Sequence, residues 1–108
     1  MANRVFLAAY RVRPGHEAEV LPHLREEMAT LRGRGHVTSR PAPVCRTAAG
    51  GYLVVAEWAT EHSVDDAHAD DVIIETWHRK DRILEYVAPA ALDGADVEFA
   101  SFERIEDV

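Results

Sequence analysis

VFLAAYRV at residues 5–12 and YLVVAEWA at residues 52–59 are the two stretches of this chain that decide its fold. Both are nearly continuous apolar runs of strand length, which is typical of strands covered on both faces. Between them, the apolar residues from Val20 to Leu31 recur at three- and four-residue steps, as on one face of an amphipathic helix. The sequence therefore predicts a strand, a helix and a second buried strand in this order.

A further strand is predicted between that helix and the second apolar run, from His36 to Thr47. It carries Pro41 and Pro43, which cannot donate hydrogen bonds to a neighbouring strand. We therefore expect this strand to lie at an edge of the sheet or to carry a bulge. The sequence AAGG at residues 48–51 predicts the turn of a hairpin with the next strand.

The remainder of the chain is predicted to form a helix and a last strand. Thr60 or Ser63 can cap the helix, whose apolar spacing extends to Leu84 and either continues or breaks near residues 70–71. The last strand is predicted at residues 97–105 (VEFASFERI).

The resulting order, βαββαβ, predicts one α+β domain over residues 1–108 with a ferredoxin-like antiparallel sheet. In this arrangement the first and third strands are central neighbours, and the second and fourth strands are the edges. Two helices can cover only one face of such a sheet. Apolar side chains on the other face would remain in water, so we expect a homodimer in which two sheets cover each other.

The charge balance restricts the partners that this chain can have. It has 12 basic and 19 acidic residues, a formal net charge of -7, which disfavours both nucleic acid and an anionic membrane surface. Cys45 is the only cysteine, so no intrachain disulfide can form, which fits a reducing compartment. The apolar run at residues 5–9 is too short for a signal peptide or a membrane span. We therefore expect a cytoplasmic location.

His68 is the first candidate for chemistry, because it lies at helical spacing from apolar residues on both sides. An imidazole at the mouth of a pocket can act as a base, although an inward histidine is often hydrogen-bonded to backbone instead. With Asp71, Glu75 and His78 it would form one face of a continuous helix, which could equally be a solvated acidic surface. No metal site and no cofactor are predicted.

Aromatic residues give the second set of candidates. Trp58 and Trp77 are predicted to line a pocket for a small aromatic ligand between sheet and helices, with Tyr10 and Tyr86 as hydrogen-bonding walls. The same residues are equally consistent with a packed core. Arg46, on the second strand, could orient an anionic substrate or simply lie on an exposed edge.

Four stretches carry a resemblance to a known family: YRVRPG at residues 10–15, Glu57-Trp58, residues 63–68 and FASFE at residues 99–103. With them the chain resembles the antibiotic-biosynthesis-monooxygenase family of the dimeric α+β barrel superfamily over residues 4–105. The resemblance implies a dimeric α+β barrel and cofactor-independent oxygenation of a small aromatic compound. The family's haem-degrading branch resembles this chain less, because Ala8-Ala9 stand where that branch carries an asparagine.

In the enzyme that the resemblance implies, His68 moves a proton and Arg46 or Tyr10 stabilises the developing anion. Trp58, Trp77 and Tyr86 would then bind the substrate. The alternative is a non-catalytic dimeric module that binds a small ligand or serves in a stress response. It is kept because no position in the sequence combines a nucleophile, a base and an orienting partner.

Overall fold

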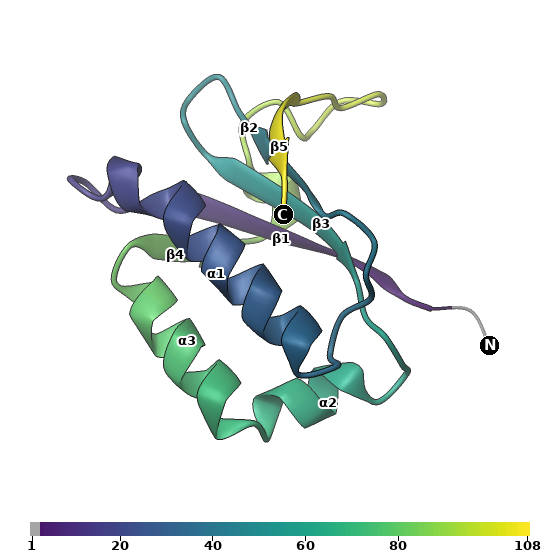
Figure 1. Ribbon diagram of the computed structural model, residues 1–108. Helices are drawn as coiled ribbons and strands as arrows, with labels where there is room; N and C mark the ends of the chain where they lie inside the picture. The colour runs from purple at the N-terminus through teal and green to yellow at the C-terminus, as the bar shows by residue number, and fades with distance from the viewer. Residues whose placement is uncertain (1–2) are drawn as a thin grey trace.

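The two apolar runs are neighbours in one antiparallel sheet. The computed structural model describes residues 3–108, in which β1 (Val5–Val12) pairs with β3 (Tyr52–Glu57) from Val5↔Glu57 to Tyr10↔Tyr52. Within these residues the sheet has five strands in the order β4-β1-β3-β2-β5 (Figure 1). The predicted adjacency of the first and third strands is confirmed. The remaining strands are β2 (Pro43–Arg46), β4 (Leu84–Val87) and β5 (Glu103–Asp107).

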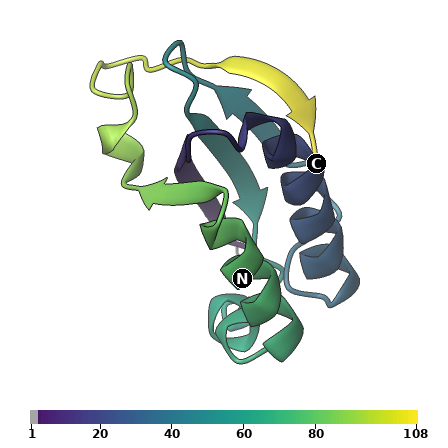
Figure 2. The same ribbon diagram turned by 90° about the vertical axis from the view of Figure 1, so that its left-hand side faces the viewer.

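The helices lie together on one face of this sheet, as Figures 1 and 2 show. They are α1 (Val20–Gly33), α2 (Ser63–His68) and α3 (Asp71–Asp81). Pro22 lies in the first turn of α1, where a backbone N–H has no acceptor within the helix and its loss costs little. None of the helices in the described part of the chain is long and apolar enough to cross a membrane.

A break separates α2 from α3, as one of the two alternatives from the sequence predicts. The carboxylate of Asp70 accepts a hydrogen bond from the backbone N–H of Val72 and so caps α3. Because α2 ends at His68 and α3 begins at Asp71, His68 does not share one continuous helix face with the acidic residues of α3. The shared helix face that a continuous helix would give is therefore not formed.

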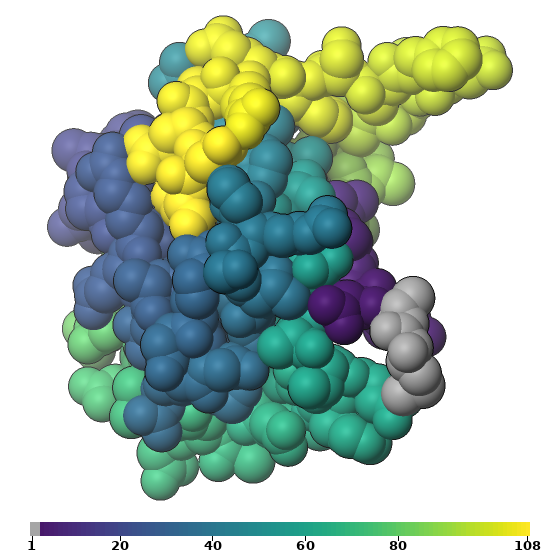
Figure 3. All heavy atoms as spheres, turned by 45° about the vertical axis from the view of Figure 1, so that its right-hand side comes forward, coloured from purple at the N-terminus to yellow at the C-terminus, as the bar shows by residue number. Residues whose placement is uncertain are grey.

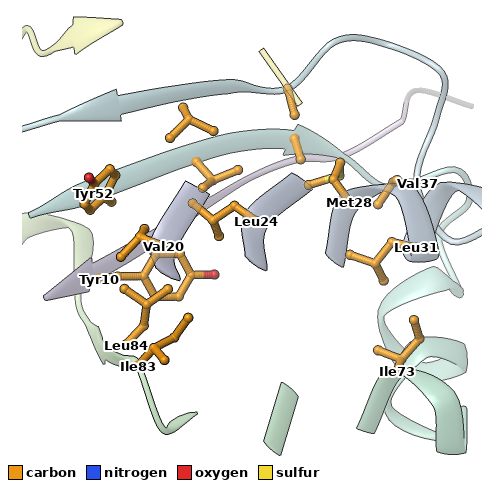
Figure 4. Packing of buried hydrophobic residues seen from close by; sticks show 14 of the residues in the cluster. Tyr10, Val20, Leu24, Met28, Leu31, Val37, Tyr52, Ile73, Ile83 and Leu84 are labelled. Carbon is orange, nitrogen blue, oxygen red and sulfur yellow. The ribbon is translucent and has the colours of Figure 1, made fainter. Parts of the chain in front are cut away.

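The main core lies between the sheet and the helices (Figure 4). Alternate residues of β1 and β3, among them Tyr10 and Tyr52, face Leu24 and Met28 of α1, and Ile73 of α3 joins the same buried cluster. Burying an aliphatic side chain of this size contributes about 1.5–3 kcal/mol. The helices are thus held to the sheet by the two apolar stripes that the sequence predicts.

The opposite face of the sheet is only partly covered. Ala9 and Leu53 on this face are buried with Leu92, which belongs to the segment between β4 and β5. At the start of β1, the side chains of Val5 and Leu7 remain 61% and 53% exposed. Part of the same segment projects from the body of the protein at the upper right of Figure 3.

Two predicted boundaries in the second half of the chain are wrong. Leu84 begins a strand instead of ending a helix, because α3 ends at Asp81 and the chain turns back to pair Leu84 with Val12 of β1. The last strand covers residues 103–107 instead of 97–105. The chain must first pass from the β4 edge of the sheet to the β2 edge, so residues 92–102 form a connection across the sheet.

The second strand also differs from its prediction. Only Pro43–Arg46 forms β2, because Pro41 cannot extend the ladder and only an isolated bridge, Val37↔Trp58, forms before it. β2 is not an edge strand, since β5 pairs with its outer side. The bulge that the prolines predict does occur, between Val44 and Cys45.

Candidate functional site

A cavity of about 470 Å³ opens between the start of β1, the end of β4 and the helices α2 and α3. Its volume falls within the range of about 300–1,000 Å³ that is usual for small-molecule sites. Five of the six residues predicted for the site line it: Tyr10, Trp58, His68, Trp77 and Tyr86. The fold therefore brings residues from four separate elements and one loop to a single cavity.

Arg46 is the one predicted residue that the structure places elsewhere. It lies on β2, where its guanidinium is 3.6 Å from a carboxylate oxygen of Glu103 on β5. The hollow that Arg46 borders is a different one, shared with Thr47 and Asp93. In this arrangement Arg46 cannot stabilise an anion in the cavity.

A buried lysine forms the polar centre of the cavity wall. Lys80 of α3 is only 1% exposed, and its Nζ donates to Glu27 Oε2 at 2.6 Å. Nζ also donates to the hydroxyl oxygens of Tyr10, at 3.1 Å, and Tyr86, at 2.7 Å. An ammonium group has three N–H donors, so each of them has a partner.

Aromatic rings surround the same ammonium group. Nζ of Lys80 lies 5.0 Å from the ring centre of Tyr10, 4.8 Å from that of Tyr86 and 5.9 Å from that of Trp77. At these distances the negative faces of the rings attract the cation. The positive charge is therefore stabilised away from water, directly behind the wall of the cavity.

Glu27 of α1 completes this polar group. Its Oε2 accepts from Lys80 and also from the indole N–H of Trp77, at 2.9 Å. This second hydrogen bond fixes the orientation of the Trp77 ring. One carboxylate thus neutralises the buried cation and positions an aromatic wall of the cavity.

Sequence reasoning missed Glu27 and Lys80, although a signal for both exists. Glu27 lies three residues after Leu24 and four before Leu31, on the apolar stripe of α1. Lys80 lies seven residues after the buried Ile73, on the apolar stripe of α3. Opposite charges on the buried faces of two helices indicate an internal ion pair, since a lone buried charge is too costly to be retained.

Tyr10 is a neutral hydrogen-bonding group in this site. Burial, and then the charge of Glu27 and the contact with Tyr86, raise the pKa of the Tyr10 hydroxyl well above its ordinary value. Tyr10 therefore cannot act as a phenolate base near neutral pH. Its ring centre lies 4.9 Å from that of Tyr86, which is directly opposite on β4.

Tyr86 of β4 lines the cavity. Its side chain is 54% exposed, and its oxygen accepts a hydrogen bond from Lys80. Since this oxygen accepts from Lys80, the O–H of Tyr86 can still donate to a ligand. A phenol polarised by an adjacent ammonium group is a strong donor to an anionic oxygen.

His68 lines the cavity at the end of α2. Its Nδ1 lies 2.7 Å from the backbone oxygen of Val64, and its ring centre is 4.7 Å from that of Trp77. A carbonyl oxygen can only accept, so Nδ1 carries the proton; Nε2, which has no hydrogen-bond partner within residues 3–108, has a lone pair in the neutral ring. The backbone contact, which from the sequence alone is an alternative to a catalytic role, is thus compatible with Nε2 acting as a base.

The other wall is apolar. The rings of Phe6 and Trp58 are stacked with their centres 4.3 Å apart. The chain has two tryptophans, and both line the cavity. Flat aromatic surfaces of this kind favour a flat aromatic ligand.

Within residues 3–108, no three His, Cys, Asp or Glu side chains are grouped as the ligands of one metal ion would be. Comparisons of the chain with protein-family models, with curated proteins and with solved structures find no match.

Proposed function

We propose that this protein binds a small aromatic compound in the cavity, removes a proton from it and lets the resulting anion react with dioxygen without a cofactor. One observation carries the proposal: His68, whose Nδ1 is bonded to backbone, and Tyr86, whose hydroxyl accepts from Lys80, line the same aromatic cavity. The first group can accept a proton, and the second can stabilise the negative charge that its removal leaves.

The proposed reaction converts an acidic methylene group between aromatic rings into a ketone. His68 accepts a proton as the C–H bond breaks, and the electron pair delocalises onto an oxygen that Tyr86 holds by a hydrogen bond. The carbanion forms a C–O bond with dioxygen. The O–O bond then breaks, one oxygen stays as the ketone, and the other leaves as water with both methylene protons. The carbon loses four electrons, which is the number that dioxygen needs.

Lys80 acts in this scheme through Tyr86 and is a positioning residue. Its three N–H groups are occupied by the protein, so it donates no hydrogen bond to the substrate. Its charge makes the hydroxyl of Tyr86 a better donor as negative charge develops. On the protein side this interaction is shielded from water, because Lys80 is only 1% exposed, and charges interact more strongly there than in bulk water.

Oxygen consumption with anthrone, which has an acidic methylene between two rings, tests the proposal. We expect wild-type protein to consume one dioxygen per anthrone. Replacing the base in His68→Gln should slow the reaction at least about 100-fold, and Tyr86→Phe should cost about 10²–10³-fold. His62→Gln, a change at an exposed histidine outside the cavity, is the control and should not alter the rate. Equal rates for wild type and His68→Gln would exclude His68 as the base.

A second candidate function is ligand binding without catalysis. It is favoured by the completeness of the Lys80 group, whose donors are all satisfied without a ligand, as in a purely structural network. A non-catalytic protein would bind aromatic compounds in the cavity and show no oxygen uptake with any of them. Binding of anthrone under anaerobic conditions, followed by admission of air, separates the two candidates.

We further propose that the chain acts as a homodimer in the cytoplasm, without nucleic acid or membrane as a partner. The exposed Val5 and Leu7 on the open face of the sheet support a second copy as its cover. Val97 and Phe99, which are 60% and 87% exposed, lie in the segment that crosses this face and support the same partner. Native mass spectrometry should give a mass near twice the 12.0 kDa of one chain. A monomer at micromolar concentration would exclude this assembly.

A further inference from the structure

The first half of β1 has an open edge beside the cavity. β3 pairs with β1 from Val5 to Tyr10, whereas β4, on the other side, pairs only with residues 9–12. Within residues 3–108, no strand continues this ladder past Ala9. The backbone groups that point to this side at residues 5 and 7 are therefore left without a strand partner.

The directions of these groups follow from two hydrogen bonds at the ends of β1. Trp58 N donates to Arg4 O on the β3 side, and Arg13 N donates to Ile83 O on the β4 side, each at 2.9 Å. Because successive residues of a strand direct their backbone groups to opposite sides, all odd-numbered residues of β1 face the β4 side. Leu7 therefore directs both its N–H and its C=O to the open edge.

The position of Leu7 in two hollows agrees with this direction. Leu7 lines the functional cavity, and it also lines a separate apolar groove on the opposite face of the sheet with Leu53 and Leu92. Its side chain faces the groove, because it alternates with Phe6 and Ala8, which pack on the helix side. Its share of the cavity wall is therefore its backbone.

Pro89 explains why the ladder stops. In the register of β1 and β4, Ala9 lies opposite Val87, so a longer β4 would place residue 89 opposite Leu7. Proline has no N–H to donate to the C=O of Leu7. The chain instead turns away in a 3₁₀ turn at Pro89–Ala91 and leaves the Leu7 groups to the cavity.

We propose that the ligand of the cavity carries a hydrogen-bond donor beside an acceptor on one edge of its aromatic system, and that Leu7 binds both. This proposal rests on the ligand site of the proposed function and names the class of ligand. The N–H and C=O of one extended residue point the same way, side by side, so a cis-lactam pairs with both as one more strand residue would. A wholly apolar ligand would instead displace water from Leu7 and leave both groups unsatisfied, which is unfavourable.

The test uses two matched compounds, carbostyril, a bicyclic lactam, and N-methylcarbostyril, which lacks the donor. We expect carbostyril to bind at least about tenfold more tightly, since the methylated compound leaves the Leu7 carbonyl unsatisfied. In a ¹H–¹⁵N spectrum, the Leu7 amide should move downfield with carbostyril, together with the two tryptophan indole signals. Leu7→Pro removes the N–H that holds the lactam C=O, which both compounds carry, so it should weaken the binding of both, whereas Val5→Pro, the same change at an open edge position outside the cavity lining, should leave both affinities unchanged.

The outcomes separate this inference from the proposed function. If the indole signals shift equally with both compounds while the Leu7 amide does not move, the cavity binds ligands but Leu7 does not select them, and the inference is overturned alone. If neither compound shifts the indole signals, the ligand site itself is wrong and both proposals are overturned. The wild-type spectra decide this even if Leu7→Pro does not fold.

Discussion

Replacing Lys80 by methionine should destabilise the protein strongly, although the new side chain has a similar length and an apolar body. The change leaves the carboxylate of Glu27 inside the protein, 6% exposed, with only the indole N–H of Trp77 as a hydrogen-bond donor. Removing one partner of a buried ion pair typically costs about 3–5 kcal/mol. The hydroxyls of Tyr10 and Tyr86 also lose a donor; water can replace it at Tyr86, which is 54% exposed, whereas Tyr10 is buried.

A double-mutant cycle turns this reasoning into a measurement. Lys80→Met and Glu27→Leu should each lower the free energy of unfolding by about 3 kcal/mol or more, measured by urea denaturation at neutral pH. The double variant replaces the pair by apolar side chains and should lie within about 1–2 kcal/mol of the wild type. The coupling energy should therefore be several kcal/mol. Single effects below about 1 kcal/mol that add in the double variant would refute a buried pair, since that is the behaviour of solvated surface charges.

Two further predictions concern the dependence of stability on pH. Burial is the main cause that lowers the pKa of His23, whose Nε2 has no hydrogen-bond partner among the described residues. The unfolded chain therefore takes up this proton first, and the urea midpoint should fall as the pH drops below about 6.5. In His23→Leu the urea midpoint should depend less on pH over this range. An unchanged pH dependence would mean that another group causes it. Hydrogen bonds from Arg34 and His36 hold the pKa of Asp70 well below its ordinary value. The charged carboxylate therefore stabilises the fold fully at any pH above that ordinary pKa. This contribution to stability should be lost as the pH falls from about 4 towards the lower pKa of the folded state. Thermal unfolding in acid should therefore show a smaller loss of stability for Asp70→Asn than for the wild type.

The elements that could be predicted from the sequence are those with an unambiguous hydrophobic period. The runs at residues 5–12 and 52–59 have no competing interpretation, and their adjacency follows from the order of the elements. Leu84 is ambiguous, because a residue that follows a helix by three positions can continue its apolar stripe or begin a buried strand. The position of β5 could not be predicted, since it depends on which edge of the sheet the chain reaches after residue 102.

The candidate site also contains residues that could be predicted from the sequence and residues that could not. The aromatic residues and His68 are recognisable by type and by spacing within their own elements. The pairing of Glu27 with Lys80 joins residues 53 positions apart, and periodicity within one helix says nothing about which residue of another helix lies opposite. The backbone of Leu7 is still less visible in sequence, because its role depends on the register between β1 and β4.

The central claim is that an aromatic compound binds between Trp58 and Trp77, and the indole signals of these two residues in a ¹H–¹⁵N spectrum test it most directly. Because the chain has only two tryptophans, the spectrum contains two such signals. Titration with α-naphthol should shift both with the same saturable curve and a stoichiometry of one per chain, while the Leu92 amide on the opposite face of the sheet stays in place. Saturable shifts at Leu92 with both indole signals unmoved would place the ligand in the groove on the opposite face of the sheet and contradict the proposed binding site.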